Sequence, residues 1–86
     1  MSHYVYMLFS VNSKRSITYV GYSVDPNKRL EKHNSGIGAK FTKGRKWIII
    51  YKKRFKTKSN ALKFEYFLKK NIKLRKIIKN QKINEY

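Results

Sequence analysis

Hydrophobic residues along the chain form three short runs that predict β-strands. Both faces of the first run, His3–Phe9, are apolar or aromatic, as in a central strand that is covered on both sides. The second run, Ile17–Tyr22, is rich in β-branched and aromatic residues. The polar segment Ser10–Ser16 between these runs predicts an antiparallel hairpin. A third run, Trp47–Tyr51, continues toward Phe55. We therefore expect a small antiparallel sheet of three strands.

A helix is predicted directly after the second strand. It should begin at Pro26, because Asp25 can accept hydrogen bonds from the free N–H groups and proline at the first helical position loses no hydrogen bond. It should run to about Asn34, and Gly36 should end it. The sequence thus predicts a strand, a turn and a helix as one local unit.

This unit carries three residues of chemical interest. Arg29 and His33 are four positions apart, so they share one face of the predicted helix. Tyr19 lies on the strand that precedes it. A cation, an imidazole and a phenol delivered by one unit indicate a site that handles phosphate. The alternatives are that Tyr19 is a core aromatic and that the helical pair is a solvated face.

Two further helices are expected after the third strand. The first should be capped by Thr57 or Ser59 and should run to about Lys70. The second should run from Ile72 to about Lys82 as a basic helix. Its apolar stripe would consist of Leu74, Ile77 and Ile78.

Glu65 interrupts the apolar face of the first of these helices. At 3.6 residues per turn, that face is formed by Ala61, Phe64, Leu68 and Ile72. Carboxylates are rarely buried without a partner, and the chain has only 4 acidic residues. Two interpretations stay open: a surface ion pair between Glu65 and Lys69, or a metal-binding carboxylate at the rim of the core.

The charge of the chain points to a polyanionic partner. Lys and Arg total 22 against 4 acidic residues, which gives a formal net charge of +18. Nucleic acid is the partner favoured by this balance, and an anionic membrane surface is the alternative. The glycine-rich segment Gly36–Lys46 is expected to contact the DNA backbone rather than to be merely flexible. Its cations are Lys40, Lys43, Arg45 and Lys46.

Length and composition limit the class of protein. The 86 residues, 1–86, are expected to form a single domain with one modest core. The absence of cysteine excludes disulfides and thiolate metal sites and favours an intracellular compartment, cytoplasm or nucleus. No apolar run reaches the length of about 20 residues that crosses a bilayer, so no membrane insertion is expected.

The residues singled out above resemble the GIY-YIG endonuclease family. Tyr4-Val5-Tyr6 and Tyr19-Val20-Gly21 look like the two tripeptides of its signature, although the first departs from Gly-Ile-Tyr and keeps only its final tyrosine. The full ordered series is Tyr6, Tyr19, Gly21, Arg29, His33 and Glu65. The resemblance extends from Tyr4 to about Lys70 and is greatest to the nuclease domain of Slx-type structure-specific endonucleases and to small stand-alone members.

The resemblance implies an α+β fold, a three-stranded antiparallel sheet flanked by helices, with catalytic groups on one face. It implies that Glu65 holds Mg²⁺ or Mn²⁺ and that Arg29 binds the scissile phosphate. Tyr6, Tyr19 and His33 would handle the attacking water, with the general base unassigned among them. Gly21 is expected to let substrate or the helix approach the strand closely.

The function expected from the residues and the resemblance together is metal-dependent hydrolysis of phosphodiester bonds in DNA. Branched or structured DNA, in repair or recombination, is implied by the resemblance alone. Whether a protein partner or a homodimer is involved stays open. The first alternative is a catalytically inactive nucleic-acid-binding module of the same fold. The second is a structural basic protein, which would not need this ordered set of residues.

Overall fold

A three-stranded antiparallel sheet forms the centre of the protein. The computed structural model describes residues 1–11 and 17–83. The strands are β1 (His3–Ser10), β2 (Thr18–Ser23) and β3 (Trp47–Phe55), and their order in the sheet is β2-β1-β3. The first strand in the sequence is therefore the central one, as its two apolar faces predict. Residues 12–16, most of the expected polar turn, lie outside the described part of the chain.

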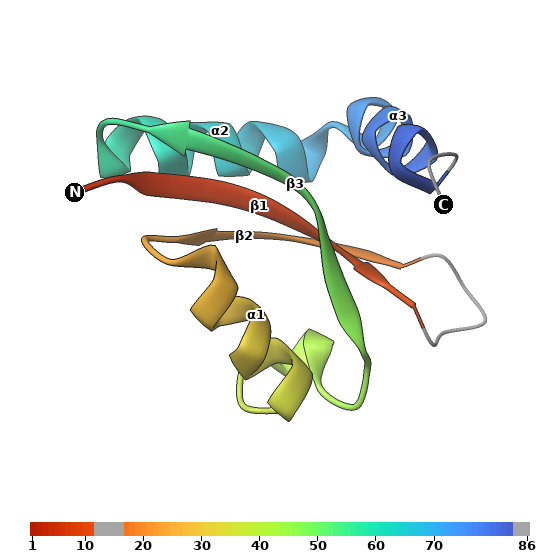
Figure 1. Ribbon diagram of the computed structural model, residues 1–86. Coiled ribbons are helices and arrows are strands. Elements are labelled where there is room, and N and C mark those ends of the chain that lie inside the picture. Colours follow the sequence, from red (N-terminus) through yellow and green to blue (C-terminus); the bar gives the residue numbers. More distant parts are fainter. Residues whose placement is uncertain (12–16, 84–86) are drawn as a thin grey trace.

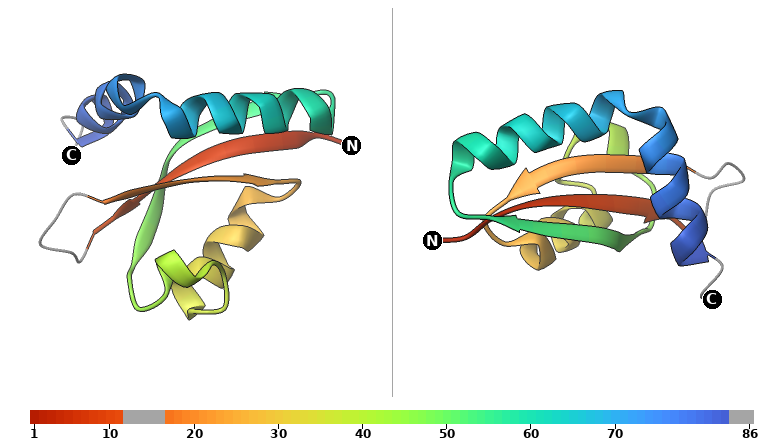
Figure 2. Two further views of the ribbon diagram at one scale, coloured as in Figure 1. Left: turned by 180° about the vertical axis from the view of Figure 1, so that it is seen from behind. Right: turned by 90° about the horizontal axis from the view of Figure 1, so that it is seen from above.

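Helices cover both faces of the sheet. Helix α1 (Pro26–Ser35) and a short 3₁₀ helix, η1 (Lys40–Thr42), lie on one side (Figure 1). Helices α2 (Lys58–Lys70) and α3 (Ile72–Ile83) lie on the other side and meet at an angle (Figure 2). The predicted fold class, an α+β fold with a three-stranded antiparallel sheet flanked by helices, is confirmed.

The alternation along β1 divides the apolar residues into two clusters. Val5 and Met7 face α2 and α3, where they pack with Ala61, Leu68 and Ile78. Tyr6 and Leu8 face α1 and pack with Trp47. Successive side chains of a strand point to opposite faces, so a single strand supplies both clusters. Tyr6 thereby lies on the α1 side of the sheet.

The helix ends follow the expected capping chemistry. The Asp25 side chain accepts a hydrogen bond from the N–H of Lys28, and Gly36 ends α1 with a left-handed φ of 85°. Of the two candidate caps for α2, Thr57 is the one that accepts a hydrogen bond, from the N–H of Asn60. The strand and helix boundaries otherwise agree with expectation to within one or two residues.

Two residues expected on apolar helix faces are exposed instead. Ile72, assigned to the core-facing stripe of α2, is 61% exposed, because α2 ends at Lys70 and the chain turns at Asn71 before α3 begins. The spacing of the stripe does not continue through that turn. Ile77 is 48% exposed, whereas Ile78 packs into the core. Among the described residues, no helix is long and apolar enough to cross a membrane.

Candidate active site

Tyr6 crosses over Gly21 of the neighbouring strand. The two residues are directly opposite in the pairing of β1 with β2. A Cβ atom on Gly21 would lie 2.4 Å from both Cζ and Oη of Tyr6, closer than side chains approach one another. Gly21 therefore leaves the space that the phenol ring fills. The close approach expected at this glycine is present, but the approaching group is Tyr6 and not the helix.

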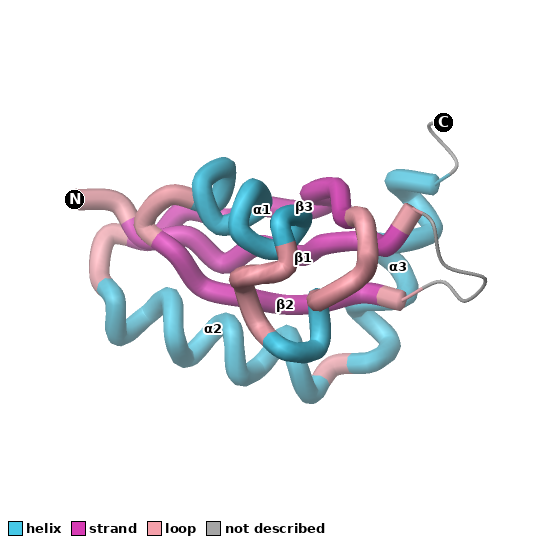
Figure 3. Tube along the Cα trace, turned by 90° about the horizontal axis from the view of Figure 1, so that it is seen from below, coloured by secondary structure: helices cyan, strands magenta, loops and turns pink. Residues whose placement is uncertain are grey.

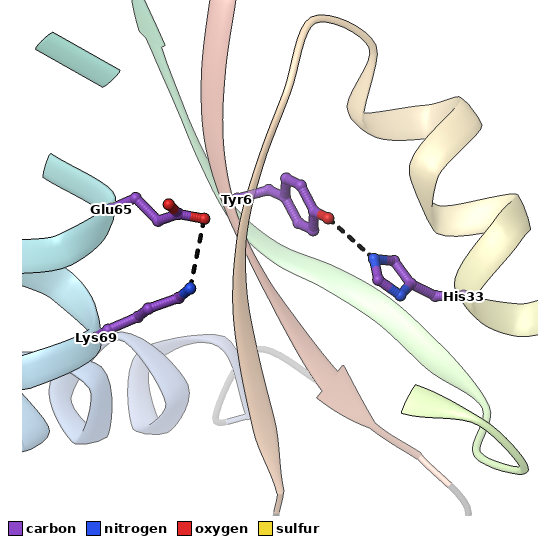
Figure 4. A network of polar contacts seen from close by, with 4 residues as sticks. All are labelled: Tyr6, His33, Glu65 and Lys69. Carbon is purple, nitrogen blue, oxygen red and sulfur yellow. Dashed lines mark hydrogen bonds and ion pairs between the residues drawn. The ribbon is translucent and has the colours of Figure 1, made fainter. Parts of the chain in front are cut away.

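The hydroxyl of Tyr6 joins a chain of buried hydrogen bonds. Its Oη lies 2.9 Å from Nε2 of His33, as Figure 4 shows. On the other side of the ring, Nδ1 of His33 lies 2.8 Å from Oγ1 of Thr42. That hydroxyl donates its one proton to the carbonyl of Ala39 at 2.8 Å, so it can only accept from His33. Nδ1 of His33 is therefore the donor.

The electrostatic surroundings fix the protonation of the pair. Burial lowers the pKa of His33 from 6.5, and the positive charge of Arg29 lowers it further. A neutral imidazole with its proton on Nδ1 accepts at Nε2, so the Tyr6 hydroxyl donates to it. Burial raises the pKa of Tyr6 above 10.0, and a hydrogen bond with Arg29 opposes that rise. Tyr6 is thus a neutral phenol that donates to His33, and Arg29 lies close enough to act on its hydroxyl.

His33 is fully buried, so the interpretation of its helix face as solvated is wrong at this position. The segment after α1 closes over the imidazole. A Cβ atom on Gly38 would lie 2.6 Å from Nδ1 and 3.0 Å from Cα of His33. The absence of a side chain at Gly38 is what lets this segment approach, and Thr42 then completes the contact from η1.

Tyr19 lies on the same side of the sheet as Tyr6. Its ring centroid is 5.1 Å from that of His33 in a tilted arrangement. It is 6.2 Å from the ring of Phe41 and 6.5 Å from that of Trp47. Tyr19 therefore forms one wall of the site, and Phe41, which is 54% exposed, extends that wall toward solvent.

Asn34 and Trp47 hold the helix, the loop and β3 together. The backbone N–H of Trp47 donates to Oδ1 of Asn34 at 2.7 Å, and Nδ2 of Asn34 donates to the Trp47 carbonyl at 3.1 Å. The indole N–H of Trp47 donates to the carbonyl of Thr42 at 3.0 Å. These contacts anchor both ends of the segment that carries Thr42, so the position of His33 depends on β3 as well as on α1.

Glu65 lies on the opposite side of the sheet from His33. In Figure 4, Glu65 and Lys69 extend from α2 toward the sheet, and β2 passes between them and the Tyr6–His33 pair. Oε2 of Glu65 is 3.6 Å from Nζ of Lys69, and its side chain is 18% exposed. The expected ion pair is therefore present. Burial is the main cause of the raised pKa of Tyr6, and the charge of Glu65 also contributes, so Glu65 lies within electrostatic reach of the site.

A metal at Glu65 would need ligands from outside the protein. Among the described residues, no group of three or more His, Cys, Asp or Glu could hold an ion. Mg²⁺ commonly uses one or two carboxylates together with water and substrate phosphate. One partly exposed carboxylate beside an open edge strand fits that arrangement. It does not fit a closed structural metal site.

The four cations proposed for DNA contact lie in and after η1. Lys43, Arg45 and Lys46 line an open groove together with the end of α1. Lys40 is exposed on η1 nearby, and the guanidinium of Arg45 lies 5.9 Å from the ring centroid of Phe41. Seen from below in Figure 3, this loop and α1 lie in front of the sheet, with β2 at its edge. The structure thus brings the loop cations to the side that carries Tyr6 and Tyr19.

Three residues of the site were not predicted: Asn34, Phe41 and Thr42. Threonine and asparagine in a glycine-rich segment are usual turn residues, so their type gave no reason to place them against His33 and Trp47. Only Phe41 could have been recognised from the sequence, because a large aromatic residue between Lys40 and Lys43 in a polar loop is unusual.

Comparison with known proteins identifies the family of the chain. The family model of the GIY-YIG catalytic domain matches residues 2–81. UPF0213 proteins of Staphylococcus aureus strains Mu3 and N315 are 43% identical over 77 residues, which cover 88% of this chain and 90% of each relative. The solution NMR structure of a UPF0213 protein from Bacillus halodurans has a TM-score of 0.52 and 38% identity, over 88% of this chain and 79% of that one. Because a GIY-YIG domain implies nuclease activity in general, and because the match spans nearly all of the sequence, the chain belongs to the GIY-YIG family of nucleases.

Proposed function

We propose that the protein is a divalent-metal-dependent DNA endonuclease that hydrolyses phosphodiester bonds in branched or otherwise structured DNA, in repair or recombination. The observation that carries the proposal is the hydrogen-bonded chain from Tyr6 through His33 to Thr42, with Arg29 acting on the same tyrosine hydroxyl. A buried polar network stabilises a fold only when every donor and acceptor in it is hydrogen-bonded, and it destabilises the fold otherwise. A module that only binds nucleic acid needs no such network.

In this proposal, Arg29 binds the scissile phosphate. Its planar guanidinium can donate to two phosphate oxygens, and it acts on the pKa of Tyr6, so it lies near that hydroxyl. A phosphate held by Arg29 is therefore brought to the end of the Tyr6–His33 hydrogen bond. The same cation offsets part of the charge that develops on the phosphate during attack.

The Tyr6–His33 pair provides a route for the proton of the attacking water. The water gives a proton to Oη of Tyr6 while the hydroxyl proton of Tyr6 passes to Nε2 of His33. The imidazole is neutral beforehand, because burial and the charge of Arg29 lower its pKa, so it is free to take that proton. Thr42 keeps the accepting nitrogen directed at Tyr6. Tyr19, whose ring centroid lies 5.1 Å from that of the imidazole, is the alternative acceptor.

GIY-YIG nucleases generally use divalent metals, and Glu65 would hold the ion, Mg²⁺ or Mn²⁺. Such an ion would supply Lewis-acid stabilisation of charge on the phosphate and on the leaving oxygen. Lys69 keeps the carboxylate of Glu65 paired, at 3.6 Å, on the side of β2 that faces α2. Substrate lying across the edge strand β2 would meet Arg29 from one side and Glu65 from the other.

Phe41 supports the choice of branched or structured DNA. Its ring is 54% exposed beside Tyr19, and Arg45 lies 5.9 Å from the ring centroid. An exposed aromatic ring next to cations suits stacking with an unpaired base, and base–aromatic stacking contributes about 1–3 kcal/mol per base. Paired bases in a continuous duplex do not offer a free face. Junctions and flaps do.

The test is cleavage of labelled linear duplex, flap and four-way DNA at several Mg²⁺ and Mn²⁺ concentrations. The parent protein should cut in a metal-dependent way and should prefer the flap or the four-way substrate. Glu65→Gln should bind DNA without cutting it, whereas Glu31→Gln, the same change at an exposed position of α1, should cut normally. Metal-independent cutting, or full activity of Glu65→Gln, would refute the metal role. A preference for continuous duplex would refute the substrate class.

The relatives support a proposal for the compartment. Those reported above are bacterial, and bacteria have no nucleus. We therefore propose the cytoplasm, and not a nucleus, as the place of action.

A further inference from the structure

One face of α3 forms a basic pocket against the start of β2. Arg75, Lys76 and Lys79 line it together with Ile72 and Thr18. The helical members are spaced by three, four and seven positions from Ile72, which places them on one side of α3. Neither the proton route nor the expected metal at Glu65 uses any of these residues. The pocket is therefore a separate feature of the surface.

Arg75 carries an unsatisfied donor at this place. Its Nε is buried and has no hydrogen-bond partner within the described part of the chain. Buried polar atoms are nearly always hydrogen-bonded, and an unpaired one calls for an explanation such as a ligand that is bound in use. A guanidinium presents its donors in a planar fork that matches the oxygens of a phosphate.

The cations of the pocket also repel one another. Arg75 and Lys79 are four positions apart and Lys76 and Lys79 three, both separations at which like charges oppose helix formation. Among the described residues, no carboxylate lines the pocket to offset them. An anion placed between the three cations would remove this repulsion, and the hydroxyl of Thr18 could donate a further hydrogen bond to it.

We propose that this pocket binds a backbone phosphate of the DNA at a distance from the scissile phosphate, an inference that rests on the proposed nuclease function. Thr18 directly precedes Tyr19 on β2, so their side chains point to opposite faces of the edge strand. Helix α3 follows α2 on the side of the sheet that carries Glu65 (Figure 1). DNA lying across β2 can therefore place one phosphate at Arg29 while another phosphate enters the pocket.

NMR of the Glu65→Gln protein tests the contact directly. The ¹⁵N–¹H signal of Arg75 Nε should shift when flap DNA is added without metal, and Lys76→Gln with Lys79→Gln should abolish that shift. Inorganic phosphate is the comparison ligand. If it shifts the Arg75 signal at the same low phosphate concentration as the DNA does, the ligand is free phosphate and the proposal is wrong. A signal unmoved by DNA, in a protein whose Arg29 signal moves, would also overturn it.

Binding measurements provide the matched control. The double variant Lys76→Gln/Lys79→Gln should lower the slope of log Kd against log salt by about 1, as expected for the loss of one phosphate contact. Lys63→Gln/Lys73→Gln removes the same charge from exposed positions of α2 and α3 outside the pocket and should lower it less. An equal reduction of the slope in the two double variants would overturn the proposal that the pocket binds a phosphate.

The two proposals fail in different ways. If the parent protein cuts DNA but the Arg75 signal does not respond to DNA, the proposed phosphate contact at the pocket is wrong and the nuclease function stands. If Arg75 responds to DNA but no substrate is cut with any metal, the pocket binds DNA and the nuclease function is wrong.

Discussion

Replacing Gly21 with alanine should destabilise the protein by displacing Tyr6. The new Cβ atom would lie 2.4 Å from Cζ and Oη of Tyr6, whereas ordinary contact begins at 3.4 Å, so the ring must retreat by about 1 Å. Overpacking of this kind costs about 1–3 kcal/mol. If the retreat also breaks the 2.9 Å bond to His33, the buried acceptor that remains adds a further cost of about 1–3 kcal/mol.

Thermal and urea unfolding measure this cost. For a domain of this size, 1 kcal/mol corresponds to about 4–8 °C in Tm, so a fall of at least about 4 °C is expected. Cleavage should fall as well, because the proton route begins at Tyr6.

The control is the same substitution in a Tyr6→Leu background. Leucine lacks the two ring carbons and the hydroxyl oxygen of Tyr6 that lie nearest to the new Cβ atom, so Gly21→Ala should cost little there. An unchanged Tm for the single variant Gly21→Ala, or an equal cost in both backgrounds, would refute the assignment of Gly21 as the space for Tyr6.

Three further predictions concern the same network. Thr42→Val keeps the side-chain volume but leaves the Nδ1 proton of His33 without an acceptor, so urea unfolding should show a loss of about 1–3 kcal/mol. The pKa of His33 is lowered on folding, so unfolded chains bind the proton more readily, and the free energy of unfolding should fall as the pH drops below the unfolded pKa of 6.5. Unfolding measured at several pH values should show a flatter pH dependence of this free energy in His33→Gln. Arg29→Lys should lose most cleavage in single-turnover assays while DNA affinity changes little, because a point charge replaces the planar fork; normal cleavage would exclude Arg29 from the phosphate.

Elements with strong local signals could be predicted from the sequence. Asp25-Pro26 and Gly36 mark both ends of α1, and the structure places the caps at those residues. The two apolar faces of His3–Phe9 identified the central strand, because only a strand covered on both sides tolerates that pattern. The spacing of Arg29 and His33 also placed them next to each other, and both act on Tyr6.

Contacts set by long-range register could not be predicted in this way. That Gly21 faces the ring of Tyr6 depends on how β1 pairs with β2, which no local pattern specifies. Thr42 reaches His33 only because the segment after α1 turns back over the helix. Ile72 was wrongly assigned to the apolar face of α2, although Asn71 is a residue type that often caps helices. The Asn71 side chain accepts a hydrogen bond from the N–H of Leu74, so α3 begins there.

The strand order β2-β1-β3 has a consequence for synthesis of the protein. The central strand leaves the ribosome before both of its partners, and the second partner, Trp47–Phe55, follows only after the hairpin and α1 have been made. Until then, one edge of an apolar strand is unpaired and available to other nascent chains. Fragments that end before Trp47 should therefore aggregate, and a pause in translation after α1 should be more harmful than one after β3.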